Sequence, residues 1–135
     1  MATAFVSVSY AHHCALSAEL DAIAGALSAH GITAHIFVRA YTFAPDDARA
    51  MMAAALRDLH AADLLIAEVT HKAIGVGVEV GMAAALGKPV IYVRHADAEP
   101  STTVGGLAAA HITYRDAADL EAQLSATLAR GLTPR

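Results

Sequence analysis

Glu79 is the one charged residue in the apolar, alanine-rich segment from Val78 to Leu86. Two glycines, Gly75 and Gly77, precede it and would let a ligand approach the backbone closely. A carboxylate in such a place either complements the positive end of a helix or takes part in chemistry. In the second case Glu79 would be a catalytic group. The glycines and the apolar surroundings favour the chemical role.

Glu79 lies where a predicted strand passes into a predicted helix. The run Leu64–Val69 is short and apolar, which is typical of a strand buried on both faces. We expect a helix over Val78–Leu86, closed by Gly87, and a second strand over Val90–Val93. Units of this kind are parallel and right-handed. Glu79 is therefore predicted in the first turn of its helix, at the carboxyl end of a central strand, where open α/β sheets bind ligands.

The same alternation of strand and helix patterns covers the whole chain. Hydrophobic periodicity predicts further strands over Ala4–Val8, Ile32–Val38 and His111–Tyr114, and further helices over residues 15–30, from Asp46–Asp47 to about Ala62, over Val104–Ala110, and from Asp116 to Gly131. Alternating strands and helices predict a doubly wound, five-stranded parallel sheet of the flavodoxin or Rossmann-like α/β class. We expect the strand order 2-1-3-4-5 in one domain spanning residues 1–135.

This strand order brings distant residues together. In this order the first and third strands are neighbours, and the strand order reverses between them. The loops after these two strands therefore flank one crevice. Ser7, Ser9 and Tyr10 lie at the end of the first strand. They should therefore converge with Glu79, although about seventy residues separate them in the sequence.

The composition of the chain indicates which kinds of molecule the protein is expected to bind. The chain has 135 residues, of which 56% are hydrophobic, and a formal net charge of −4, without a basic stripe that would bind nucleic acid. Cys14 is the single cysteine, which fits a reducing compartment. The sequence shows neither a membrane-spanning stretch nor a secretory signal. We expect a cytoplasmic protein that acts on small molecules, not on nucleic acid or membranes.

Two other kinds of site fit the motifs poorly. The run from Gly75 through Gly77 to Gly81 is similar to a dinucleotide fingerprint, but its third glycine falls one place late and its loop begins several residues after the strand. The eight histidines include no pair at helical i, i+4 spacing with an acidic partner, as a metal site would need. We therefore expect neither a metal nor a cofactor.

The central stretch resembles the nucleoside 2-deoxyribosyltransferase family, and most closely its branch of 2′-deoxynucleoside 5′-phosphate N-hydrolases. The matching residues are Ala67-Glu68-Val69-Thr70, followed by Gly75-Val76-Gly77-Val78-Glu79-Val80-Gly81. In that family the glutamate of the second motif is the glycosyl-accepting nucleophile. The resemblance implies cleavage of the N-glycosidic bond of a (deoxy)nucleoside or its 5′-monophosphate, by hydrolysis or base transfer. It also implies a homodimer with sites completed across subunits.

The resemblance extends to phosphate binding. It implies that the loop holding Ser7, Ser9 and Tyr10 approaches the sugar and its 5′-phosphate, although the family's arginine is missing from this loop. Ser101 would reach the phosphate in the neighbouring subunit's site. Where the family has a phosphate-binding serine before its glycines, this chain has alanine, so the adjacent Lys72 would hold the anion instead.

The departing base needs a proton or a hydrogen bond, and its source is less certain in the sequence. The family carries an aspartate beside the reacting sugar, and by ungapped counting that position is Ala55. Asp58 lies one turn further along the same helical face and is a possible substitute. Asp58, Glu68 and His71 are three candidates that the sequence does not rank.

Two other functions stay open at this stage. The stretch from Phe5 to His12 resembles the first strand of TIR-like NAD glycohydrolases, which also use a glutamate on a related sheet. A non-enzymatic nucleotide-sensing or receiver module would share the fold. The receiver alternative is weakened because no acidic pair ends the first strand, where a phosphoacceptor site needs one for its metal.

Overall fold

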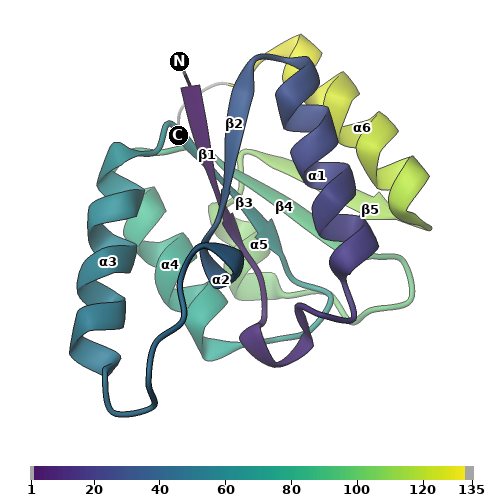
Figure 1. Cartoon of the computed structure of the whole chain (residues 1–135). Helices are drawn as coiled ribbons and strands as arrows, with labels where there is room; N and C mark the ends of the chain where they lie inside the picture. Colours follow the sequence, from purple (N-terminus) through teal and green to yellow (C-terminus); the bar gives the residue numbers. More distant parts are fainter. Residues whose placement is uncertain (1, 133–135) are drawn as a thin grey trace.

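The computed structural model describes residues 2–132 as one parallel sheet with helices on both faces (Figure 1). Residue 1 and residues 133–135, at the two ends of the predicted domain, lie outside the described part. The elements are β1 (Ala2–Ser7), η1 (Tyr10–His12), α1 (Ser17–Ala29), β2 (Ile32–Ile36), α2 (Phe37–Ala40), α3 (Ala48–Ala61), β3 (Leu64–Glu68), α4 (Ile74–Ala85), β4 (Val90–His95), α5 (Thr102–Leu107), β5 (Ala110–Tyr114) and α6 (Ala117–Arg130). The strand order β2-β1-β3-β4-β5 confirms the predicted doubly wound sheet.

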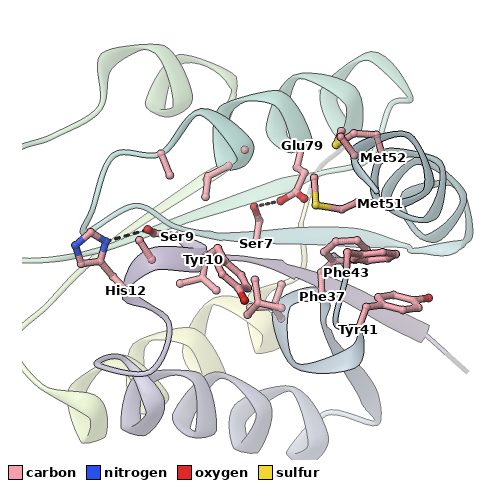
Figure 2. Close-up of a pocket in the computed structure, with 18 of the residues that line it drawn as sticks. Ser7, Ser9, Tyr10, His12, Phe37, Tyr41, Phe43, Met51, Met52 and Glu79 are labelled. Carbon is pink, nitrogen blue, oxygen red and sulfur yellow. Dashed lines mark hydrogen bonds between the residues drawn. The ribbon is translucent and has the colours of Figure 1, made fainter. Parts of the chain in front are cut away.

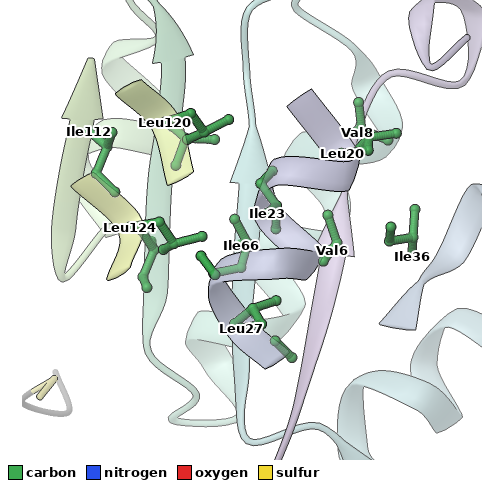
Figure 3. Close-up of a cluster of buried hydrophobic side chains, with 14 of the residues drawn as sticks. Val6, Val8, Leu20, Ile23, Leu27, Ile36, Ile66, Ile112, Leu120 and Leu124 are labelled. Carbon is green, nitrogen blue, oxygen red and sulfur yellow. The ribbon is translucent and has the colours of Figure 1, made fainter. Parts of the chain in front are cut away.

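Side chains alternate across the sheet into two apolar layers. Val6 and Ile66 point toward α1 and α6, where they join the leucines and isoleucines of those helices (Figure 3). Phe5 and Leu65, their neighbours in sequence, point the other way, toward α3 and α4. Each strand in the middle of the sheet is thus buried on both faces, which explains why its sequence is a continuous apolar run.

Helix α4 begins four residues earlier than predicted. It starts at Ile74, so Gly75 and Gly77 lie inside the helix and not in a loop before it. Glu79 is consequently its sixth residue, in the second turn. The reason is packing: Val76 and Val80 are both buried on one side of α4, and this burial outweighs the roughly 1 kcal/mol that each glycine costs a helix.

Strand β2 also ends earlier than predicted. The chain leaves the sheet after Ile36 and forms the short helix α2, because Phe37 turns into the second apolar layer and stacks on Phe5 at 5.5 Å between ring centroids. Helix α5 is shifted two to three residues toward the N-terminus of its predicted range and begins after Ser101, whose hydroxyl accepts a hydrogen bond from the Val104 N–H. The helix closures predicted at glycine are confirmed, since Gly87 has a φ of 75°.

None of the helices in residues 2–132 has both the length and the apolar character needed to cross a membrane.

Candidate active site

A cavity of about 650 Å³ opens at the carboxyl end of the sheet, on the side of α3 and α4. Its walls come from the end of β1, from η1, from the segment between β2 and α3, and from the start of α4 (Figure 2). This is the position predicted from the strand order. The lining side chains include Ser7, Ser9, Tyr10, His12, Phe37, Tyr41, Phe43, Met51, Met52, Lys72, Gly75 and Glu79.

A short hydrogen bond joins Glu79 to the sheet. The Ser7 hydroxyl, which is almost completely buried, donates to Glu79 Oε1 at 2.5 Å. Glu79 lines the cavity, and its second oxygen, Oε2, accepts no hydrogen bond from a described residue. One carboxylate oxygen is thereby fixed in direction while the other stays available to a ligand.

The surroundings of Glu79 act on its pKa in two opposed ways. Burial raises the pKa of the carboxyl, and the hydrogen bond from Ser7 offsets part of this rise. Glu79 was predicted in the first turn of its helix, where the helix dipole would favour the charged form. It lies in the second turn instead, and the dipole acts mainly within the first.

One end of the cavity is polar. Ser9 is buried at the end of β1, and its hydroxyl lies 3.0 Å from His12 Nδ1. Figure 2 places both on the same side of the Ser7–Glu79 pair. Lys72 lines this cavity too, and its ammonium forms an exposed ion pair with Glu99 at 3.4 Å. Hydroxyl, imidazole and ammonium groups together suit an anion.

The opposite end of the cavity is aromatic and apolar (Figure 2). The ring of Tyr41 lies 5.1 Å from Phe37 and 5.4 Å from Phe43, and two methionines from α3 face these rings. We call Phe37, Tyr41, Phe43, Met51 and Met52 the aromatic wall. None of these five residues was among the site residues predicted from the sequence.

Asp58 does not line this cavity. Its carboxylate lies behind the aromatic wall, where it accepts hydrogen bonds from Tyr41 Oη at 2.7 Å and Arg57 Nε at 3.1 Å and pairs with His35 Nε2 at 2.8 Å. Burial disfavours the charged form of Asp58, but these three partners outweigh it and hold the pKa below 3.8. The structure therefore makes Asp58 a support for Tyr41 and not a neighbour of Glu79.

We expect Asp58→Asn to weaken folding by about 1–2 kcal/mol at neutral pH, because it removes charge-assisted hydrogen bonds from a carboxylate that is only 14% exposed. A carboxyl with a lowered folded pKa stabilises the protein above its ordinary pKa of 3.8 and loses this effect as the pH falls through the folded value. The difference between the two proteins in urea denaturation should thus shrink below pH 4 or so. A difference that stays constant in acid would contradict the role of the charge.

Glu68 lies on the other face of the sheet and is fully buried. It accepts hydrogen bonds from the Thr70 N–H and hydroxyl and, at 2.7 Å, from the Tyr114 hydroxyl. Burial raises the pKa of Glu68, and these donors offset part of the rise. Glu68 does not line the cavity, so the structure does not bring this predicted substrate-binding residue to Glu79.

Three other predicted site residues lie beside the cavity. His71 stacks flat on His12, with ring centroids 3.8 Å apart, and its buried Nδ1 has no hydrogen-bond partner among the described residues. Gly77 and Ser101 face a smaller hollow of about 320 Å³ on the far side of the α4 N-terminus, which Lys72 also lines. Within residues 2–132, no three His, Cys, Asp or Glu side chains are grouped so that they could hold a metal ion.

Comparison with known proteins agrees with this geometry. Among solved structures, the chain is similar to the CMP N-glycosidase BcmB of Clostridium botulinum, with 19% identity, a TM-score of 0.67, and coverage of 93% of this chain and 99% of that one. It is also similar to a 3-dehydroquinate dehydratase-like protein from Bifidobacterium longum, with 17% identity, a TM-score of 0.52, and coverage of 93% and 94%. At these identities the likeness shows the fold alone.

Sequence comparison is more specific. None of the curated proteins matches the chain significantly. The model of the nucleoside 2-deoxyribosyltransferase family, however, matches residues 10–123, which hold most of the cavity lining and the Glu79 motif. The chain therefore belongs to the nucleoside 2-deoxyribosyltransferase family.

Proposed function

We propose that this protein cleaves the N-glycosidic bond of a (deoxy)nucleoside or its 5′-monophosphate, with Glu79 as the nucleophile. The observation that carries the proposal is the Glu79 carboxylate, held by Ser7 between a polar end and an aromatic end of one cavity. A nucleotide has the same three parts in the same order: an anionic phosphate, a sugar and a flat ring. The family match and the N-glycosidase activity named for BcmB support this choice over a nucleotide-sensing module.

The proposed reaction has two steps at the anomeric carbon. As the bond from this carbon to the base nitrogen breaks, positive charge develops on the sugar, and Glu79 Oε2 bonds to the carbon to give a glycosyl ester. Water then hydrolyses the ester, or a second base accepts the sugar. Ser7 keeps Oε1 in place through both steps, so that Oε2 stays aimed at the sugar.

Substrate binding divides along the cavity. We propose that Ser7, Ser9 and Tyr10 border the sugar, and that His12 and Lys72 attract the 5′-phosphate near the N-terminal end of α4, where Gly75 lets the ligand come close. The base lies against the aromatic wall.

A substrate panel tests the whole proposal: nucleosides, 5′-monophosphates and NAD are incubated with the protein, and free base is measured by chromatography. Base release from none of them would refute the function.

We expect Ser7→Ala to move the acid limb of the kcat/KM profile to higher pH. The reactive form of Glu79 is ionised, and the Ser7 hydrogen bond favours that form, while burial disfavours it. Without Ser7 the pKa of Glu79 rises further, so activity is lost at a higher pH as the solution is acidified. Ser9→Ala is the matched control, because Ser9 bonds to His12 and not to Glu79. An unmoved limb in Ser7→Ala would show that Ser7 does not set this pKa.

We also propose a homodimer that forms through α4 and brings Ser101 to the partner's phosphate site. Ile74 is 89% exposed and Val78 is 43% exposed, one turn apart on the same helix. A Cβ built on Gly77, which lies between them, or on Gly81 further along the helix would meet no atom within 4 Å. The single, exposed Cys14 fits our expectation of a reducing cytoplasm.

Ile74→Arg should therefore turn a dimer into a monomer at micromolar concentration, because it places a charge at the centre of an apolar contact. Light scattering measures this directly, with the exposed Leu56→Arg on α3 as control. A wild-type protein that is already a monomer would exclude the proposed dimer. If Ser101→Ala leaves the preference for a 5′-monophosphate unchanged, the contact across subunits is wrong even if the dimer exists.

A further inference from the structure

Resting on the glycosidase function proposed above, we propose that the preferred substrate carries a positively charged ring on its anomeric carbon, such as a pyridinium or an N7-alkylated purine. The inference comes from the base end of the cavity, where aromatic rings and thioethers gather and where, among the described residues, no carboxylic acid lines the wall. A cationic ring is a leaving group that can depart from such a site without being protonated.

Among the described residues that line the cavity, Glu79 is the only carboxylic acid. Besides Glu79, the titratable ones are Tyr10, His12, Tyr41 and Lys72. Figure 2 shows His12 beyond Ser7 and Glu79, on the side away from the aromatic wall. Tyr10 is 71% exposed and its ring contacts His13, and Lys72 pairs with the exposed Glu99.

Tyr41 is the one titratable residue in the aromatic wall, and its hydroxyl proton already forms a hydrogen bond to Asp58. Its hydroxyl donates to Asp58 Oδ2 at 2.7 Å and accepts from Arg57 at 2.9 Å. Asp58 itself lies behind the wall, and Glu68 lies on the other face of the sheet. The two carboxylates that the sequence offered as acids are thus both out of reach of the base.

The charge of the leaving base determines whether the lack of a general acid slows the reaction. When the bond to a neutral base breaks, both bonding electrons stay on the ring nitrogen, and the base departs as an anion unless an acid protonates it. A general acid typically contributes about 10²–10⁴ in rate. When the ring is already a cation, the same two electrons neutralise it. It then departs as a neutral base, and the only proton released comes from the water that later hydrolyses the Glu79 ester.

The aromatic wall suits the charged ring in the ground state. A cation over an aromatic face gains about 0.5–1 kcal/mol where exposed and about 2 where desolvated. Phe37, Tyr41 and Phe43 line the cavity with three aromatic rings, whose centroids lie 5.1–6.2 Å apart. During cleavage the positive charge moves from this wall to the anomeric carbon, beside the Glu79 carboxylate. The cavity therefore stabilises the charge at both ends of its path.

Matched substrate pairs test this directly on the wild-type protein. Nicotinamide riboside and its 5′-monophosphate are compared with their reduced, uncharged dihydropyridine forms, which have the same sugar and nearly the same ring. N7-methylguanosine and guanosine, each also as the 5′-monophosphate, form a second pair, and cytidine 5′-monophosphate is a further neutral substrate. We expect the cationic member of each pair to be cleaved at least about a hundredfold faster in kcat/KM, since it needs no general acid.

The outcomes separate the two proposals. Neutral substrates cleaved as fast as their cationic partners would overturn this inference and leave the glycosidase function standing. No base released from either class would overturn the function and this inference together. Phe43→Leu removes one aromatic face and should lower the cationic preference about threefold or more, in line with one cation–π contact. An unchanged preference in a variant with normal melting would show that the wall does not recognise the charge.

Discussion

Glu79→Gln is expected to stop base release while the protein stays folded. The substitution keeps the size of the side chain and an oxygen that can accept the Ser7 hydrogen bond, so the packing of α4 on β1 is preserved. It removes the negative charge and the nucleophilic oxygen. Loss of that role should lower kcat at least about a hundredfold, which is roughly 2.7 kcal/mol of activation free energy. Thermal melting should change little, since a neutral amide is easier to bury than a carboxylate.

A control variant and a mass-spectrometry experiment test whether Glu79 is the nucleophile. Glu121→Gln makes the same chemical change at an exposed position on α6 and should leave both activity and melting unchanged. Mass spectrometry of wild-type protein, acid-quenched during turnover, should find a glycosyl adduct on the peptide that contains Glu79. A Gln variant that still releases base at the wild-type rate would end the proposed mechanism, whatever the natural substrate is.

Glu68→Ala is expected to give the largest loss of stability. The side chain is completely buried and accepts hydrogen bonds from two groups of Thr70 and from the Tyr114 hydroxyl. Truncation leaves these donors without an acceptor and opens a cavity. Each buried unsatisfied group costs about 1–3 kcal/mol, so the free energy of unfolding should fall by about 3 kcal/mol or more. In a domain of this size the melting temperature should drop by roughly 10 °C.

Glu68→Gln separates charge from shape in this network. Burial raises the pKa of Glu68, so its stabilising effect is complete below its ordinary pKa of 4.5 and declines as the pH rises through the folded value. The amide does not titrate, so the wild type should lose stability relative to Glu68→Gln as the pH rises across that window. Base release by the folded variant should match the wild type. A large change in KM would mean that Glu68 contacts the substrate, as the sequence hypothesis held.

The sequence predicted the sheet well and drew attention to Glu79, which lines the cavity, because both depend on patterns local to a few residues. A nearly continuous apolar run such as Leu64–Val69, which only Glu68 interrupts, fits best in the middle of a parallel sheet. Glu79 was noticeable because every neighbour in its segment is apolar. The start of α4 was wrong because Gly75 and Gly77 lower helix propensity locally, and only the tertiary burial of Val76 reverses that preference.

The rest of the site depends on the directions in which side chains point, and the spacing of residues in the sequence does not determine these directions. Asp58 follows Ala55 by three residues, which on a helix is a rotation of about 60° away from the same line. That rotation is enough to turn its carboxylate toward Tyr41 and His35 instead of the cavity. The aromatic wall has no periodicity at all, because Tyr41 and Phe43 lie in an irregular segment. Their joint orientation comes from ring packing on Phe37, which only the folded chain brings about.

The hydrogen bond between Ser7 and Glu79 joins a strand to a helix, and this limits how the protein can evolve. Ser7 is fixed by the sheet, whereas the height of Glu79 above it depends on how closely α4 rests on its buried residues Val76, Val80 and Ala83. A larger or smaller side chain at any of these three positions would move the carboxylate, although Val80 and Ala83 do not line the cavity. We therefore expect these three positions to tolerate changes in side-chain volume poorly, even though none of the three is polar.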